Sequence, residues 1–367
     1  MNKPFDTFTY AHEHFQELAW MSQNTNHLFP PAIVQKAITQ ASKEMRYQEY
    51  PYAPGLEEMK RLLLEDFGLS GVKVGITAGG TEALYMIMRG LLGPGDEVIS
   101  SDPSYLIIHK FIGLSGAQTV NLDIYSPPYR MTVDRIQEAI GPKTRMILLI
   151  DPLNPLGSGY PKEEVKAISE IAHDKKLILL NDVTYRDFAD QHTLTHTIAP
   201  EQTVTVWSLS KNCGLAGLRL GGLMALPELY DKVWKYNTND LGVNVLAQYA
   251  GLAALKAKPE VFPKIKAQCR ENQKRIKEVV DSIDGAFLPV YPSQANMFVI
   301  DISKLGIEPE KLQQEMLLKY GVFVRSGSYL SPKFGKKFVR LSFSNKPADI
   351  AAFAKALPLA ISTVKNG

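Results

Sequence analysis

Between about residues 55 and 255, short runs of continuous apolar residues alternate with stretches in which apolar residues recur every three or four positions. Continuous runs are typical of strands buried on both faces, and the longer spacing is typical of helices that bury one side. The clearest strands are expected over 144–150 (TRMILLI) and 176–180 (KLILL), with a helix over 162–173 between them. This pattern predicts an α/β fold with a mostly parallel sheet covered by helices on both faces.

The other elements of this region continue the alternation. Helices are expected over 56–67, 81–92 and 105–114, and strands over 73–77, 97–100, 118–122, 204–208 and 219–225. After about residue 255 the pattern changes to a long charged helix over 259–283, short strands near 297–300, 322–325 and 338–343, and helices over 308–320 and 346–363. We therefore expect a large domain over residues 46–255 and a smaller α+β domain formed by residues 1–45 and 256–367.

Composition excludes several classes of protein. A length of 367 residues favours two domains, and a net charge of +3 gives no support to a nucleic-acid partner. The two cysteines, Cys213 and Cys269, have no metal-type spacing, so we expect neither a disulfide scaffold nor a metal site. The first residues do not resemble a signal peptide, and no apolar stretch is expected to reach the about 20 residues that cross a bilayer. These features predict a soluble cytoplasmic protein without a membrane partner.

Ligands of an open parallel sheet bind beyond the carboxyl ends of its strands, so the polar residues there are the first candidates for a site. Lys211 follows the expected strand 204–208, with Ser208 and Ser210 beside it and Arg219 eight residues later. Taken alone, a lysine in this position is more often an ordinary loop residue. An aldehyde cofactor such as pyridoxal 5′-phosphate needs an amine of this kind, and hydroxyls and an arginine fork can bind its phosphate.

Three further side chains lie near the ends of the two clearest strands. Asp182 follows KLILL, and a buried carboxylate can keep a pyridine nitrogen protonated. Tyr185 can hydrogen-bond the phenolic oxygen of such a ring, and Asn154 can donate to the same oxygen from a turn rich in proline and glycine. Ordinary explanations also exist for each of them: a turn residue, a half-buried aromatic and an Asx turn.

The segment 77–83 (TAGGTEA) joins an expected strand to a helix, and Gly80 and Thr81 begin that helix. Free backbone N–H groups and the helix dipole favour a phosphate there. The segment matches neither the G-x-G-x-x-G nor the G-x-x-x-x-G-K-[ST] pattern, which counts against a dinucleotide or P-loop site. Tyr105, after another expected strand, offers a flat face for stacking on a heteroaromatic ring, although core packing explains it equally well.

In combination and in this chain order, the motifs resemble the class I and II aminotransferases, which are pyridoxal-phosphate enzymes of fold type I. The motifs are S-L-S-K at 208–211 with Arg219, D-x-x-Y at 182–185 and N-P-x-G at 154–157. The histidinol-phosphate aminotransferase-like branch is the most similar. The resemblance implies that Lys211 holds the cofactor as a Schiff base. It implies phosphate contacts from Ser208, Ser210, Arg219, Gly80 and Thr81, and ring contacts from Asp182, Tyr185, Asn154 and Tyr105.

The resemblance extends to three further residues. Tyr50, in the segment 50–56 (YPYAPGL), matches a tyrosine that reaches the phosphate of a neighbouring subunit, which implies a homodimer with shared active sites. Arg340, in 338–343 (FVRLSF), matches the arginine that binds the substrate α-carboxylate. Asn24 belongs to a segment similar to the one that folds over the substrate. Leu156 replaces the commoner threonine of the N-P-x-G turn, which leaves the amide of Asn154 unaffected.

The implied function is transfer of an amino group between an amino acid and a 2-oxo acid by a ping-pong mechanism. A decarboxylase similar to threonine-phosphate decarboxylase, a β-lyase or a racemase stays open, because the sequence does not show the substrate pose. A non-catalytic domain that binds the cofactor fits the complete set of motifs less well than an enzyme does. A dehydrogenase fits these motifs even less well. Residues 20–30, 236–244 and 326–331 are expected to select the substrate. The polar composition of the last two favours a polar or phosphorylated side chain.

Overall fold

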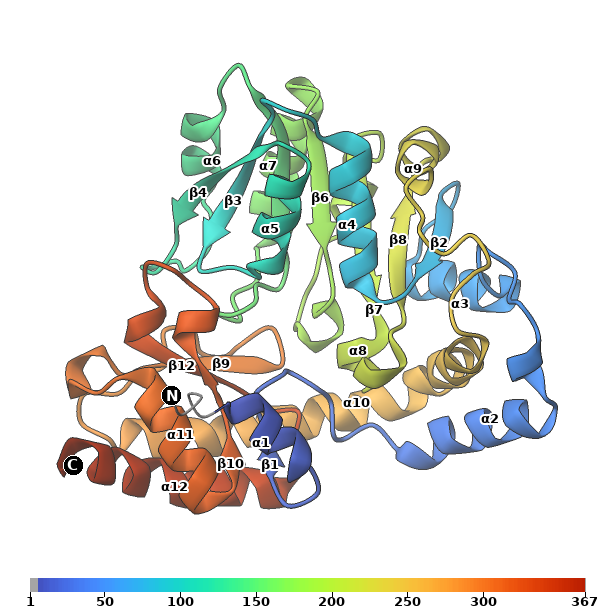
Figure 1. Cartoon of the computed structure of the whole chain (residues 1–367). Coiled ribbons are helices and arrows are strands. Elements are labelled where there is room, and N and C mark those ends of the chain that lie inside the picture. The colour runs from blue at the N-terminus through green and yellow to red at the C-terminus, as the bar shows by residue number, and fades with distance from the viewer. Residues whose placement is uncertain (1–5, 367) are drawn as a thin grey trace, which may run out of the picture.

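The computed structural model of the chain describes residues 6–366; residues 1–5, at the start of the predicted small domain, and Gly367 lie outside this part. Within residues 6–366 the largest sheet has seven strands in the order β2-β8-β7-β6-β5-β3-β4. Strand β8 (Gly221–Ala225) is antiparallel to both of its neighbours, and the other neighbouring pairs are parallel. Helices cover both faces (Figure 1), so the predicted fold class is confirmed.

The remaining strands of this sheet are β2 (Lys73–Thr77), β3 (Glu97–Asp102), β4 (Gln118–Asp123), β5 (Thr144–Ile150), β6 (Ile178–Asp182) and β7 (Thr203–Ser208). The helices around it are α3 (Glu57–Phe67), α4 (Gly80–Leu91), α5 (Ile107–Leu114), α6 (Val133–Ala139), α7 (Lys162–Asp174), the short α8 (Leu209–Asn212) and α9 (Pro227–Trp234). Strand β6 begins later than predicted, because Lys176 has φ +55° in the turn that ends α7. The strand ends at Asp182, which is paired with Ile150 of β5.

The C-terminal part has a three-stranded antiparallel sheet of β11 (Arg325–Ser326), β12 (Phe338–Ser342) and β9 (Met297–Asp301) among the described residues. Strand β1 (Ala19–Trp20) pairs in parallel with β10 (Val322–Phe323). Helices α1 (Thr7–Glu13), α11 (Pro309–Tyr320) and α12 (Pro347–Asn366) complete this part. The prediction of one strand over 322–325 is wrong, because the chain changes partners at Val324: β10 joins the N-terminal segment, and β11 joins β12.

Helix α10 (Val245–Asp281) crosses the predicted domain boundary at residue 255 without interruption. Figure 1 shows it running beneath both parts of the molecule. The first 45 residues divide between the parts, because β1 pairs with the C-terminal β10 while α2 (Pro31–Lys43) packs along α10. The boundaries 46–255, 1–45 and 256–367 stay a prediction.

Helix α12 corrects one expectation from the sequence. It is the one helix in the described range that is long and apolar enough to cross a membrane, with a mean hydropathy of 1.2. Its apolar residues Ile350, Phe353, Leu357 and Ile361 are buried in the protein and recur every three or four positions. This spacing is typical of an amphipathic helix that packs on a protein core.

Candidate active site

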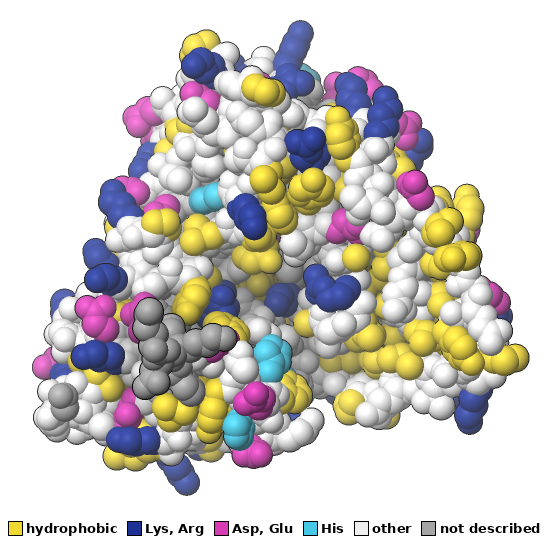
Figure 2. Space-filling model, viewed as in Figure 1, with side chains coloured by type: hydrophobic (Ala, Val, Ile, Leu, Met, Phe, Trp, Pro, Cys, Tyr) yellow, Lys and Arg dark blue, Asp and Glu magenta, His cyan; other side chains and the backbone are white. Residues whose placement is uncertain are grey.

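A cavity of about 550 Å³ lies at the carboxyl ends of β5, β6 and β7, where Ile150, Asp182 and Ser208 line it. Residues 22–25 and the arginines of β11 and β12 line its other side. Figure 2 shows a hollow between the two parts of the molecule, with Lys and Arg side chains around it. Of the site residues expected from the sequence, the structure gathers all but Tyr50 in this cavity: Asn24, Gly80, Thr81, Tyr105, Asn154, Asp182, Tyr185, Ser208, Ser210, Lys211, Arg219 and Arg340.

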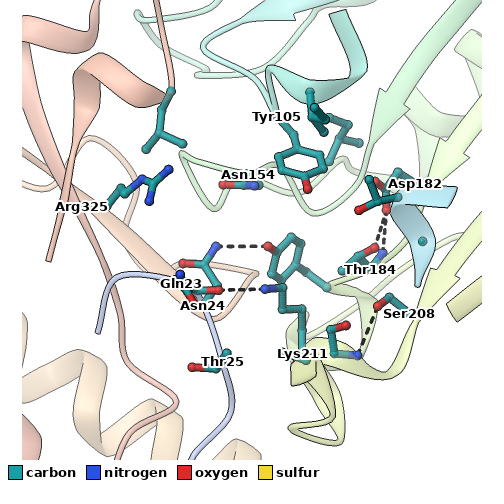
Figure 3. A pocket seen from close by; sticks show the side chains of 18 of the residues that line it. Gln23, Asn24, Thr25, Tyr105, Asn154, Asp182, Thr184, Ser208, Lys211 and Arg325 are labelled. Carbon is teal, nitrogen blue, oxygen red and sulfur yellow. Dashed lines mark hydrogen bonds between the residues drawn. The ribbon is translucent and has the colours of Figure 1, made fainter. Parts of the chain in front are cut away.

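Lys211 is placed by the abrupt change from strand β7 to helix α8. Ser208 caps this helix, since its Oγ accepts a hydrogen bond from the backbone N–H of Ser210 at 3.1 Å. The Nζ of Lys211 donates to the carbonyl oxygen of Gln23 at 2.8 Å, so the amine faces the N-terminal segment (Figure 3). Burial, with help from the charges of Arg340 and Arg219, lowers the pKa of Lys211 to about 7. An amine with this pKa is partly neutral near pH 7 and can act as a nucleophile or base.

Asp182 is buried and held by Thr184. Its Oδ1 accepts from the Thr184 backbone N–H at 3.0 Å and from the Thr184 Oγ1 at 2.6 Å. No hydrogen bond from another described residue occupies Oδ2, and the residue lines the cavity. Burial raises the pKa of Asp182, which the Thr184 hydrogen bonds partly offset. Such a carboxylate is stabilised in its charged form by a cationic partner in the cavity.

The phenol of Tyr185 and the amide of Asn24 meet in the cavity. Asn24 Nδ2 donates to the Tyr185 hydroxyl at 3.1 Å, while burial raises the pKa of Tyr185. Asn24 adopts φ +54°, and the amide of Asn296 holds its carbonyl oxygen at 2.9 Å. The Oδ1 of Asn24 is buried and has no hydrogen-bond partner among the described residues. Because buried polar atoms are normally paired, this oxygen of a cavity-lining residue is a candidate contact for a ligand.

Arg340 is fixed from two sides. Its Nη1 donates to Asn154 Oδ1 at 2.8 Å and its Nη2 to the carbonyl oxygen of Ser22 at 2.6 Å. Burial lowers the pKa of this guanidinium to about 10, which still leaves it charged near neutral pH. Its Nε and the Ser22 Oγ are buried without partners among the described residues. An anion beside this group can satisfy its remaining donor capacity.

A second set of groups suits a phosphate. Helix α4 begins at Gly80, and its N-terminal N–H groups face the cavity that Arg219 also lines. Gly79 has φ +85°, and a Cβ at this position would lie 2.5 Å from Arg219 Nη2. Only glycine therefore allows the guanidinium to lie so close to the start of the helix. With the hydroxyls of Ser208 and Ser210 nearby, the donors present fit the phosphate of the cofactor that the sequence resemblance implies.

Tyr50 lies outside the cavity of its own chain and is 81% exposed. The neighbouring Tyr47 and Tyr52 are also exposed, and Pro51 lies close to Gly242 of the loop that precedes α10. In this loop, Leu241 is a further exposed apolar residue. These residues form an apolar surface patch that we call the tyrosine patch: Tyr47, Tyr50, Tyr52 and Leu241.

The sequence analysis missed Arg325 and Thr184, and it included Gln23 only as a member of the segment 20–30. Arg325 directly follows the apolar run Val322–Val324. This change from apolar to charged was the only feature of the sequence that marked it as a candidate site residue. Thr184, two positions after Asp182, has the spacing of a side chain that binds a neighbouring carboxylate. Gln23 acts through its backbone carbonyl, which no pattern of side chains reveals.

The depressed pKa of Lys211 leads to a prediction for the protein without cofactor. The neutral, nucleophilic fraction of an amine with a pKa near 7 rises about tenfold from pH 6 to pH 8 and then levels off. We expect the rate of uptake of pyridoxal phosphate, the cofactor that the sequence resemblance implies, to follow this curve in stopped-flow absorbance measurements. A rate that still climbs tenfold per pH unit above pH 8 would show that the lysine has its ordinary pKa.

Comparison with known proteins adds an independent line of evidence. The sequence profile of the family described as "Aminotransferase class I and II" matches residues 17–357. The aspartate aminotransferase of Pyrococcus horikoshii is 27% identical over 328 residues, covering 86% of this chain and 83% of the relative. The chloroplastic histidinol-phosphate aminotransferase of Nicotiana tabacum is 26% identical, covering 93% and 79%. The crystal structure of an aminotransferase from Mycobacterium tuberculosis has the same fold, with a TM-score of 0.84 at 22% identity, covering 100% of this chain and 98% of that one.

Proposed function

Because the chain belongs to the class I and II aminotransferases, we propose that the cavity around Lys211 is its active site and that it holds pyridoxal phosphate. The protein is an enzyme that transfers amino groups, as its family and relatives indicate. The observation that carries the proposal is the Lys211 amine, with its pKa near 7, in one cavity with the Asp182 carboxylate and the Arg340 guanidinium.

We assign the cofactor contacts from the chemistry of the groups that line the cavity. Lys211 provides the amine for covalent attachment, and Asp182 provides a buried negative charge for the ring nitrogen. The phosphate has the start of α4, Ser208, Ser210 and Arg219 as donors. Tyr185 and Asn154 are suited to the phenolic oxygen, and Tyr105 to the face of the ring. When bound, pyridoxal phosphate stores the electron pair released from the substrate Cα and carries the amino group between substrates.

Residues of the chain perform the other parts of the reaction. Arg340 binds the substrate α-carboxylate, with Asn154 and the Ser22 carbonyl holding the guanidinium in place. Lys211, once its amine is free and neutral, removes the Cα proton and later returns a proton. The segment 22–25 covers this side of the cavity and limits the access of water. With the cofactor bound, Asp182 would supply a negative charge for the ring nitrogen and would thereby favour loss of the proton.

A half-reaction tests this function. The enzyme loaded with pyridoxal phosphate is mixed with an amino acid alone, and the cofactor spectrum, the oxo acid and carbon dioxide are measured. We expect one equivalent of oxo acid per site, conversion of the cofactor to its amine form, and no carbon dioxide. Release of carbon dioxide with the cofactor unchanged would identify a decarboxylase instead and would contradict the proposal.

We also propose that the enzyme is a cytoplasmic homodimer in which Tyr50 contributes to the partner's phosphate site. The tyrosine patch supports a dimer, because exposed apolar patches mark interfaces. Figure 2 shows further hydrophobic side chains in a band on the same side of the molecule, toward α2 and α10.

Free buried cysteines fit a reducing compartment such as the cytoplasm. Membership of the histidinol-phosphate branch stays a prediction, since relatives of other specificities match comparably.

Mixed dimers test the role of Tyr50. Tyr50→Phe is expected to weaken pyridoxal phosphate binding by about tenfold, because a hydrogen bond to a charged group is lost. Mixing this variant with Lys211→Ala should restore some sites of wild-type affinity, since Lys211 of one chain then meets the intact Tyr50 of the other. Absorbance titration of the cofactor measures both effects. Failure to recover tight sites, in dimers shown by mass to be mixed, would place Tyr50 outside the shared site.

A further inference from the structure

The helix that carries Lys211 is too short to fix its own position. Helix α8 covers only Leu209–Asn212, and a helix of one turn gains little from its own hydrogen bonds. At its start, Ser208 supplies the cap described above. At its end, the Asn212 Oδ1 accepts a hydrogen bond from the Cys213 backbone N–H at 2.8 Å. The direction of the Lys211 side chain therefore depends on the contacts that hold the two ends of α8.

Asn212 is buried and is held by two distant parts of the chain. Its Nδ2 donates to Asp187 Oδ2 at 2.5 Å, and its carbonyl oxygen accepts from Asn26 Nδ2 at 2.6 Å. Asp187 lies in the short segment that follows Asp182 at the end of β6. The side-chain hydrogen bond therefore joins the segment that carries the Asp182 carboxylate to the helix that carries the Lys211 amine.

Asp187 belongs to a group of four charged residues that we call the charge cluster: Asp66 of α3, Arg186, Asp187 and Lys258 of α10. The Lys258 Nζ lies 2.7 Å from Asp66 Oδ2 and 2.8 Å from Asp187 Oδ1, and Arg186 pairs with Asp66. Burial raises the pKa of Asp187, but the charges of Lys258 and Arg186 outweigh this effect and hold the pKa below its ordinary value. Asp187 is therefore an ionised acceptor for the amide of Asn212.

The charge cluster is explained by the geometry that it fixes. Its central cation, Lys258, is only 6% exposed, and a buried ion pair adds little stability over apolar side chains of the same size. A carboxylate held by Lys258 has a defined position, and so has the amide that donates to it. Asp187, Asn212 and Lys258 lie outside the lining of the cavity. Their effect on a ligand in the cavity must therefore pass through α8.

We propose that Asp187 is a positioning residue that acts through Asn212 on the Lys211 amine, and that Lys258 holds the Asp187 carboxylate in place for this role. The inference rests on the proposed function, since it takes Lys211 as the residue that reacts with the cofactor. It concerns the position of the amine and leaves the phosphate donors at the start of α4 unaffected.

Capture of pyridoxal phosphate by the protein without cofactor tests the position of the amine. In this step the Lys211 Nζ adds to the aldehyde carbon, and loss of water leaves a C=N bond whose absorbance is followed by stopped flow. Measurements at increasing cofactor concentration separate the limiting first-order rate from the half-saturating concentration. We expect Asp187→Ala and Asn212→Ala each to lower the limiting rate by about tenfold, a fraction of the roughly hundredfold that a displacement of about 1 Å can cost. The half-saturating concentration should change by less than about threefold, because the phosphate donors remain.

A double-mutant cycle tests whether the two side chains act through their common hydrogen bond. If they do, the variant with both Asp187→Ala and Asn212→Ala should be about as slow as either single variant, because the same contact is lost in all three. Asp187→Asn keeps an acceptor oxygen of the same shape and should stay within about threefold of the wild-type rate. If Asp187→Ala does not fold, Asn212→Ala tests the same contact with the charge cluster intact.

Hydrogen exchange of the protein without cofactor gives a second readout. In Asp187→Ala, the backbone amides of residues 209–215 should exchange about tenfold faster than in the wild type, because α8 has lost one of its tertiary contacts. The amides of α4 should be unchanged. Asp190→Ala is the matched control, since Asp190 lies in the same segment but pairs with Arg270 and Lys266. Its capture rate and its exchange over 209–215 should equal those of the wild type.

Wild-type limiting rates in both Asp187→Ala and Asn212→Ala would overturn the inference. Multiplied losses in the double variant would also contradict it, since the two residues would then act separately. A half-saturating concentration that changes as much as the limiting rate would indicate a general loosening of the site and would count against a positioning role. If the wild type forms no C=N bond, or if Lys211→Ala still forms it, the proposed function fails, and that result is distinct from capture that ignores Asp187.

Discussion

Lys211→Ala is expected to abolish the cofactor absorbance that depends on covalent attachment and to reduce turnover by roughly a thousandfold to ten-thousandfold. In the proposed function the lysine is both the attachment point for the cofactor and the base for the Cα proton, so one substitution would remove two functions. Its amine faces the cavity beside Gln23, and burial together with Arg340 and Arg219 keeps it partly neutral near pH 7. Absorbance spectra of the loaded protein and steady-state rates measure the two effects.

The control for this experiment is Lys256→Ala on helix α10. Lys256 is half-exposed, pairs with Glu58 and lies outside the cavity, so its loss should leave spectrum and rate unchanged. Thermal unfolding of both variants shows whether the fold is retained. An unchanged spectrum in Lys211→Ala would mean that another group holds the cofactor.

Asp182→Asn is expected to keep the cofactor attached but to lower turnover by roughly a hundredfold to a thousandfold, the cost of removing one member of a buried charge pair. Asparagine has the same shape and can still accept the two hydrogen bonds from Thr184, so the loss of charge is the main change. In the proposed site, the carboxylate would help to keep the ring nitrogen of the cofactor protonated, so its loss would make the ring a weaker electron store. Exchange of the Cα proton with solvent, measured by NMR, should fall with turnover.

Thr184→Val provides a graded comparison for Asp182. It removes the side-chain hydrogen bond to Oδ1 but leaves the backbone N–H of residue 184 and the carboxylate in place. We expect a loss of about tenfold, because a hydrogen bond to a charged group contributes far less than the charge itself. Turnover at the wild-type rate in Asp182→Asn would exclude an electrostatic role for this residue.

The proposed site depends on its surroundings for the ionisation of each group. Burial shifts the pKa of Lys211 and Asp182 in the directions that disfavour charge, and each shift depends on what else occupies the cavity. The hydrogen bonds from Asn154 and Ser22 then fix how the charge of Arg340 is presented. This arrangement explains why residues distant in the sequence are expected to act as one unit.

Motifs at strand ends were predictable because a local rule connects them. Asp182 ends the buried strand β6, Lys211 and Asn154 follow the buried strands β7 and β5, and parallel strands end at the same edge of a sheet. Their meeting in one cavity therefore follows from short-range patterns and one topological rule. The continuous apolar runs of β5 and β6 fixed this fold class for the same reason, since strands buried on both faces have no polar alternation.

Other features depend on contacts that no local pattern encodes. The pairing of Arg325 with Arg340 required the chain to change sheets at Val324, and this change depends on β1, which lies about three hundred residues earlier. Contact of Gln23 with Lys211 joins residues 188 positions apart through a backbone carbonyl. Helix α10 crosses the expected boundary because one helix packs against both parts of the molecule, and composition changes only partway along it.

By itself, the sequence determined which chemical groups stand at the edge of the sheet, because strand periodicity and short motifs are properties of neighbouring residues. The tertiary structure alone decided how these groups are charged, what covers them and which further cation joins them. Burial, cross-strand pairing and the path of the N-terminal segment arise from packing between distant parts of the chain. Arg325 illustrates the difference, since it is one arginine among many in the sequence and lines the cavity only after folding.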